Sequence, residues 1–186
     1  MNIHINDARA GMTVIINNNL CIIQEFQHVK PGKGPAFVKL KFKNLKTGAI
    51  IEETFNTNIR LDRAHVDKKN MQYLYNQTDT YYFMDNSDYS QLEVSGNILG
   101  DNKDYLKEGL ELDLQIYEGE IINIDLPEKI DYEITETTDA IKGNTSGNAM
   151  KDATIETELV VKVPLFISVG ERVIITTKDG KYSSKA

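Results

Sequence analysis

The side chain in this sequence best placed to do chemistry is a lysine flanked by two glycines. Lys33 lies in the run Lys-Pro-Gly-Lys-Gly-Pro at residues 30–35. Pro31 fixes its own φ and Gly32 accepts a positive φ, which predicts a type II turn over residues 30–33. Because neither Gly32 nor Gly34 has a Cβ, the ammonium between them can enter a narrow cleft that bulkier neighbours would close. Lys33 is therefore the leading candidate for a functional residue.

Other interpretations of this stretch exist. The same residues fit a solvated hairpin tip whose lysines serve solubility, and the residues alone do not decide between the two. A phosphate-binding loop is not predicted, because the full Gly-x-x-x-x-Gly-Lys-Ser/Thr pattern is missing and a strand pattern follows instead of a helix. Beyond the loop, three lysines alternate with apolar residues and are candidates for sequence-independent phosphate contacts, together with Lys30. They are Lys39, Lys41 and Lys43.

No pattern in the sequence predicts metal binding, a cofactor or an enzymatic reaction. The histidines, His4, His28 and His65, are scattered and share no zinc-site spacing with Cys21. The motifs of serine hydrolases, dinucleotide-binding folds and zinc proteases are absent. As the single cysteine, Cys21 cannot form an internal disulfide, and its apolar neighbours indicate a small core residue.

Charge is distributed unevenly along the chain, whose net charge is −7. Residues 1–64 carry nine Lys/Arg against five Asp/Glu, residues 65–127 four against thirteen, and residues 128–186 eight against ten. Only the first third is basic. This asymmetry fits a protein that presents one end to RNA while an acidic middle avoids other phosphate surfaces. No long apolar run or signal-peptide pattern occurs, so a cytoplasmic protein without a membrane partner is expected.

The elements that must position Lys33 are short strands joined by tight turns. In the first third, alternating patterns predict a small all-β unit, with a short helical turn over 58–64 as the joint to the next unit. The second third opens with an aromatic hairpin, 71–75 and 80–84, whose rings we interpret as barrel wall and core and not as a base-stacking platform. A turn at Gly100 leads into a brief helix that ends at Gly109. The strands predicted elsewhere are 13–16, 20–29, 36–45 and 49–55, then 110–114 and 121–124, then 130–137, 153–163 and 172–177; a polar loop spans 142–152, and an Asp179-Gly180 turn follows the last strand.

Several of these stretches resemble bacterial elongation factor P. The resemblance begins with Phe-Gln-His-Val-Lys-Pro-Gly-Lys-Gly at 26–34 and continues through 70–75, 100–102, 142–147, 153–157 and 163–167. The sequence departs from that family at a few positions. These are Tyr105 where tryptophan is common, Asn144 for aspartate, Asp152 for proline, Glu158 for glycine and Lys185 for arginine.

The resemblance implies an SH3-like (KOW-type) domain at 1–64, a central acidic OB-fold domain at 65–127 and a C-terminal OB-fold domain at 128–186, in an elongated arrangement. It implies a monomeric factor that binds the ribosome beside the P-site peptidyl-tRNA and relieves stalling at consecutive prolines through Lys33. A lysine-modifying enzyme, rRNA and mRNA are further implied partners, and Gly143, Asn144 and Thr145 are implied RNA contacts. A general single-stranded nucleic-acid binder and a plain interaction scaffold are the alternative functions.

Overall fold

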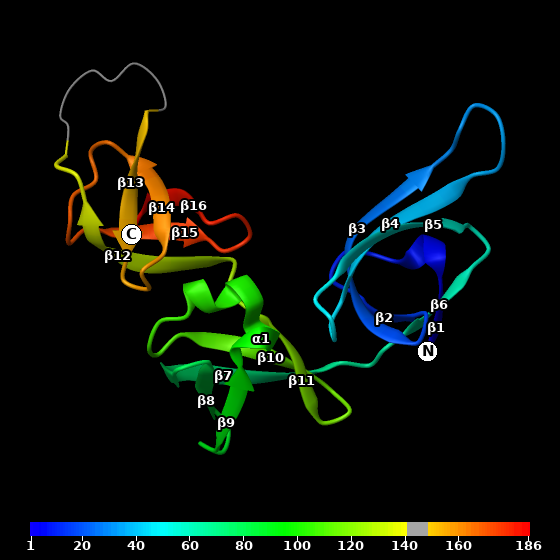
Figure 1. Ribbon diagram of the computed structural model, residues 1–186, viewed down its shortest axis with the longest axis horizontal. Coiled ribbons are helices and arrows are strands. Elements are labelled where there is room, and N and C mark those ends of the chain that lie inside the picture. Colours follow the sequence, from blue (N-terminus) through cyan, green and yellow to red (C-terminus); the bar gives the residue numbers. More distant parts are fainter. Residues whose placement is uncertain (141–148) are drawn as a thin grey trace. The chain divides into compact units, whose positions relative to one another are not determined.

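The computed structural model describes residues 1–140 and 149–186, and nearly all of its regular structure is β-strand (Figure 1). The strands form three sheets of six, five and five strands. By contacts the chain divides into two compact units, residues 1–68 with 115–123 and residues 69–114 with 124–186. No helix in the described ranges is both long and apolar enough to cross a membrane.

The first sheet has the strand order β1-β6-β2-β3-β4-β5 and encloses an apolar core that includes Val14, Ile23, Leu40 and Phe42. The turn between residues 16 and 19 has Asn17 and Asn18 at φ 52° and 62°. Asparagine tolerates this left-handed conformation better than most residues. The elements are β1 (Asn2–His4), a 3₁₀ helix (Ile5–Asp7), β2 (Thr13–Ile16), β3 (Asn19–Val29), β4 (Phe37–Asn44), β5 (Ile50–Asn56) and β6 (Arg60–Arg63).

The helical turn predicted over residues 58–64 is wrong, because this stretch contains strand β6. Leu61 is buried while Arg60 and Asp62 on either side are exposed, which is the alternation of a strand. β6 pairs with both β1 and β2. The short strand β1 was not predicted from the sequence, so the pairing that stabilises β6 was missing from the prediction.

The second sheet has the order β11-β10-β7-β8-β9, and its predicted aromatic hairpin is confirmed as β7 and β8. The brief helix begins earlier than predicted and ends at Tyr105, not at Gly109. Ser95 explains the early start, because its hydroxyl accepts a hydrogen bond from the Asn97 amide at 3.3 Å and so caps the helix. The elements are β7 (Asp67–Gln77), β8 (Thr80–Asp85), β9 (Gln91–Ser95), α1 (Gly96–Leu99), a 3₁₀ helix (Gly100–Tyr105), β10 (Glu111–Tyr117) and β11 (Glu120–Asp125).

The third sheet has the order β14-β13-β12-β15-β16. The strand predicted over 153–163 is in fact two strands joined by a tight reversal, in which Glu158 has φ 71°. The sequence hides this turn because a glutamate occupies a position that glycine normally takes in such a conformation. The elements are β12 (Lys129–Thr137), β13 (Met150–Ile155), β14 (Val160–Pro164), β15 (Arg172–Thr176) and β16 (Lys181–Lys185).

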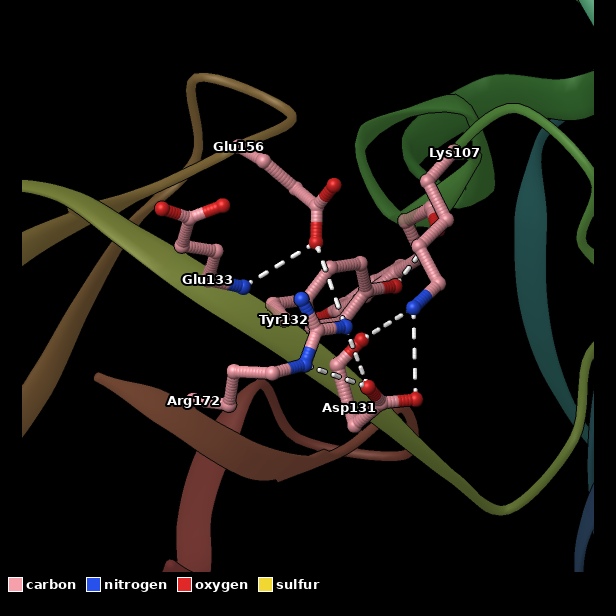
Figure 2. Close-up of polar contacts among 7 residues, drawn as sticks. Lys107, Asp131, Tyr132, Glu133, Glu156 and Arg172 are labelled. Atoms are coloured by element: carbon pink, nitrogen blue, oxygen red, sulfur yellow. Dashed lines mark hydrogen bonds and ion pairs between the residues drawn. The ribbon is translucent and has the colours of Figure 1, made fainter. Parts of the chain in front are cut away.

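Inside the second unit, a polar joint connects the third sheet to the end of the 3₁₀ helix (Gly100–Tyr105) and the segment that follows it (Figure 2). The buried Tyr132 hydroxyl of β12 donates a hydrogen bond to the Tyr105 carbonyl at 2.5 Å. Lys107 donates to the backbone carbonyl of Asp131 at 2.5 Å and lies 3.2 Å from its carboxylate. Arg172 of β15 holds the other oxygen of the same carboxylate. One aspartate is thus shared by Arg172 of the third sheet and by Lys107, which lies between the 3₁₀ helix and β10.

Candidate functional site

The candidate site is the seven-residue connection, residues 30–36, between β3 and β4. The two strands pair along most of their length, and the last pair before the connection is Val29 with Phe37. Burial alternates along β4, with Val38 and Leu40 fully buried, so the hairpin is anchored in the core of the first sheet. All of residues 30–35 are exposed, and Lys33 lies at their centre. The fold therefore presents Lys33 at the end of a well-anchored hairpin, as the sequence predicts.

The type II turn predicted over residues 30–33 is wrong. That turn requires a positive φ at Gly32, whereas the positive φ of this connection, 97°, belongs to Gly34. The chain reverses its direction over the seven residues 30–36 and not within a four-residue turn. The residue with a positive φ is therefore Gly34 and not Gly32. A Cβ added at Gly32 or Gly34 would meet nothing within 4 Å. Gly34 is thus required by backbone conformation, and any need for space around Lys33 would arise only from a partner.

The ammonium groups at the tip are not neutralised by neighbours. Within residues 1–140 and 149–186, neither Lys30 nor Lys33 takes part in a hydrogen bond or an ion pair. No Asp or Glu occurs between Glu25 and Glu52 in the sequence. The tip is therefore a compact positive charge that is available to an anionic partner.

The lysines along β4 differ from those of the tip. Lys39 forms an ion pair with Glu52 of β5, and Lys41 lies 3.4 Å from Glu25 of β3. The hydrogen bond from Lys39 is the main cause that holds the pKa of Glu52 below its usual value. Lys43 has no ion pair among the described residues, and it lies opposite Ile22 and Ile50. The outer face of β4 is therefore largely charge-compensated, while the tip is not.

The two compensating glutamates were missed in the sequence analysis. Lys41 lies directly opposite both Glu25 and Glu52 in the two strand registers. A register inferred from the alternation of β3, β4 and β5 could have found them, because opposite charges directly across a strand pair stabilise each other. The contacts predicted for Gly143, Asn144 and Thr145 cannot be placed, since these residues lie outside the described residues.

The described residues contain no group of three or more His, Cys, Asp or Glu side chains that could hold a metal ion. His65 lies 3.1 Å from Asp67 on the surface. Cys21 is buried in the first core, and burial raises the pKa of its thiol, which disfavours the nucleophilic thiolate.

Comparisons with known proteins match nearly the whole chain. Family models match the elongation factor P (EF-P) KOW-like domain at residues 4–61, the EF-P OB domain at 66–124 and the elongation factor P C-terminal domain at 130–185. They confirm the predicted all-β class and its three β domains.

Two solved structures match part of the chain, and the one with the TM-score above 0.5 shows a similar fold. One is a eukaryotic translation initiation factor 5A from Methanococcus jannaschii, with 22% identity and a TM-score of 0.51, over 67% of this chain and 93% of that one. Another is a translation initiation factor eIF-5A family protein from Naegleria fowleri, with 16% identity and a TM-score of 0.40, over 68% of this chain and 98% of that one.

Proposed function

Since the chain belongs to the elongation factor P family, we propose that it binds the ribosome beside the peptidyl-tRNA and stimulates peptide-bond formation at consecutive prolines through Lys33. The family consists of translation factors, not of classical enzymes, and it acts on the ribosome. The observation that carries the proposal is the exposed ammonium of Lys33 at the end of the β3–β4 hairpin, which has no ion-pair partner among the described residues.

The proposed mechanism is positioning. Proline is a rigid and poor acceptor, so the ester of the peptidyl-tRNA and the incoming amine seldom reach a reactive geometry. A factor that restrains the tRNA end can lower this barrier without transferring a proton itself. Lys33 would supply the one group that reaches the reaction centre. The anchored strands β3 and β4 would hold it there, since their paired backbones lose little further entropy on binding.

The other cations have a separate role in this proposal. Lys30 would bind phosphate together with Lys43, whereas Lys39 and Lys41 would first have to separate from Glu52 and Glu25. Phosphate contacts of this kind fix orientation and carry no sequence information. We further propose that a lysine-modifying enzyme extends Lys33. Intact-mass and peptide-mass measurements on protein from its native host test that extension.

A reconstituted translation system tests the function. The protein should accelerate peptide-bond formation on templates that encode consecutive prolines, with little effect on proline-free templates. Lys33→Ala should abolish most of the acceleration, and a higher factor concentration should not restore it, because the lost group acts after binding. Lys43→Gln is the matched control. It should weaken binding, more strongly at high salt, and a higher concentration should restore activity.

Two results would contradict the proposal. One is full activity of Lys33→Ala at saturating concentration. The other is an equal acceleration of proline-free templates, which would point to general RNA binding instead.

A further inference from the structure

The outer face of the second sheet carries a pair of stacked tyrosines that the proposed mechanism does not use. Tyr75 of β7 lies opposite Tyr82 of β8, with ring centroids 4.6 Å apart and an interplanar angle of 18°. Tyr75 is 51% exposed. Tyr73 and Phe83 of the same hairpin are instead buried and contact each other in the interior. The hairpin therefore places one ring pair in the core and a second, stacked pair at the surface.

A carboxylate continues this row of side chains on the next strand. Glu93 of β9 is exposed and lies directly opposite Tyr82 in the strand register. Side chains of directly opposite residues point to the same face of a sheet, with Cβ atoms about 4.5–5.5 Å apart. Glu93 forms no ion pair within residues 1–140 and 149–186, and neither hydroxyl of the stacked pair forms a hydrogen bond there. We call Tyr75, Tyr82 and Glu93 the tyrosine row.

Charge decides which kind of partner the tyrosine row can bind. Residues 70–102, which include all of β8 and β9, contain five Asp/Glu and no Lys, Arg or His. A nucleobase can stack on a tyrosine, but its phosphate would meet carboxylates here and no cation from the same stretch. A purely apolar segment would bury Glu93 without a partner, which is costly. A cationic partner satisfies both the rings and the carboxylate.

Among cationic side chains, arginine fits this arrangement better than lysine. The planar guanidinium of arginine stacks on aromatic rings and donates paired hydrogen bonds to a carboxylate, whereas the ammonium of lysine is a strongly hydrated point charge. In the sheet, β8 lies between β7 and β9. The Tyr75 ring therefore covers one face of the Tyr82 ring, and Glu93 lies on the side of the other face.

We propose that the tyrosine row is a docking site for an arginine of a basic protein segment: the guanidinium stacks on the Tyr82 ring and donates hydrogen bonds to the Glu93 carboxylate, while Tyr75 packs against the other face of that ring. This inference goes beyond the proposed function, because it needs neither Lys33 nor RNA. The docking site is tested on the protein alone and the proposed function on the ribosome, so either can fail without the other.

Nuclear magnetic resonance on the isotope-labelled, full-length protein tests the site. One probe is a short peptide in which arginines alternate with glycines, and the other is the same peptide with lysines. The arginine peptide should shift the amide signals of residues 75, 82 and 93, and it should bind more tightly than the lysine peptide by about threefold or more. Tyr82→Leu should weaken its binding by about fivefold, because the stacking on the ring is lost, whereas Tyr82→Phe keeps the ring and should bind as before.

A second variant tests the carboxylate without touching a half-buried ring. Glu93→Gln replaces an exposed side chain and should weaken binding of the arginine peptide by about threefold or more. Glu111 of β10 is also exposed, so Glu111→Gln removes the same charge elsewhere and should have a smaller effect. Tyr89 is 73% exposed and makes no ring contact within the described part of the chain, so Tyr89→Leu should leave the affinity unchanged.

Several results would overturn the inference. If neither peptide shifts the amides of the tyrosine row, there is no docking site. If both peptides bind equally and Glu93→Gln weakens binding no more than Glu111→Gln does, the attraction is a general one to acidic residues. If a single-stranded RNA oligonucleotide shifts these amides and the arginine peptide does not, the rings are a base-stacking platform instead.

Discussion

At the scale of single residues, Lys33 and Lys151 show two opposite uses of the same side chain. Lys33 is exposed and unpaired among the described residues, and the protein gains nothing from its contacts. Lys151 is buried and donates hydrogen bonds to the backbone carbonyls of Thr138 and Asp139. The sequence alone singles out Lys33, because its glycine neighbours are conspicuous. It could not single out Lys151, whose burial depends on the pairing of β13 with strands far away in the sequence.

Replacing Lys33 should therefore leave the stability of the protein unchanged. Lys33→Ala removes an exposed side chain with no partner in the described structure, and such changes shift the free energy of unfolding by less than about 0.5 kcal/mol. Thermal melting curves of the two proteins should nearly coincide. A loss of several degrees would show that Lys33 has a structural role.

Replacing Glu158 by glycine, unlike replacing Lys33 by alanine, should change the stability of the protein. It is exposed and has φ 71°, a conformation that costs a residue with a Cβ roughly 1–2 kcal/mol. Glu158→Gly removes this cost. It also raises the entropy of the unfolded chain, which lowers the free energy of unfolding by about 0.4–1 kcal/mol. The net gain in unfolding free energy should be about 0.5 kcal/mol, measured by urea denaturation. Glu158→Gln keeps the Cβ and should show no such gain.

At the scale of elements, the alternation of apolar and polar residues predicts well where strands lie. It predicts poorly where strands end and where the chain turns. The strands β2, β3, β4 and β12 were located correctly, because β4 and β12 have apolar residues at a period of two and β2 and β3 contain short apolar runs. β6 was taken for a helical turn because a single buried leucine carries its pattern, and its stability comes from pairing with β1 and β2. The turn before β14 was missed because glutamate occupies the left-handed position.

The charge-compensated face of β4 makes a prediction about binding. Glu25→Gln together with Glu52→Gln would free Lys41 and Lys39 from their ion pairs. If this face approaches RNA, ribosome affinity should increase, and its dependence on salt should become steeper by up to about two counterions, since two more cations become available. Filter binding at several salt concentrations measures this slope. An unchanged slope would show that the face of β4 does not contact phosphate.

At the scale of the whole molecule, the family and the order of its three domains could be predicted from the sequence. The short motifs that resemble the family occur in all three parts of the chain. The joint inside the second unit could not be predicted from the sequence. Its central residue, Asp131, is an ordinary surface aspartate in the sequence, and its partners Lys107 and Arg172 come from different elements. Only the folded structure brings these charges together (Figure 2).

Asp131 should make the second unit sensitive to acid. Its hydrogen bond with Arg172, assisted by Lys107, holds the pKa of its carboxyl below the usual value. A lowered folded pKa contributes stability that is present above the ordinary value of about 3.9 and is lost as the pH falls through the folded value. Asp131→Asn should thus destabilise the protein at pH 7 by about 1 kcal/mol or less, because the pair is half exposed and screened by water.

The difference from the unmodified protein should shrink as the pH falls through the lowered pKa of folded Asp131, because the carboxyl then becomes protonated in both states. Urea denaturation at several pH values measures this convergence. Asp152→Asn, an exposed carboxylate paired with Lys162 in the same sheet, is the control and should have a smaller effect at pH 7. A constant difference at all pH values would mean that the Asp131 charge does not contribute.

The position of β5 at the end of the first sheet has a consequence for self-association. Among the described strands, β5 has a hydrogen-bonded neighbour on one side only, and its residues Ile50 and Ile51 are 57% and 40% exposed. An open edge with exposed isoleucines is a template on which a second chain can add a strand and start aggregation. Glu52 and Glu53 follow immediately, and two such edges meeting in antiparallel fashion would bring these like charges close together. The glutamate that neutralises Lys39 within one molecule thus also discourages its edge from joining another.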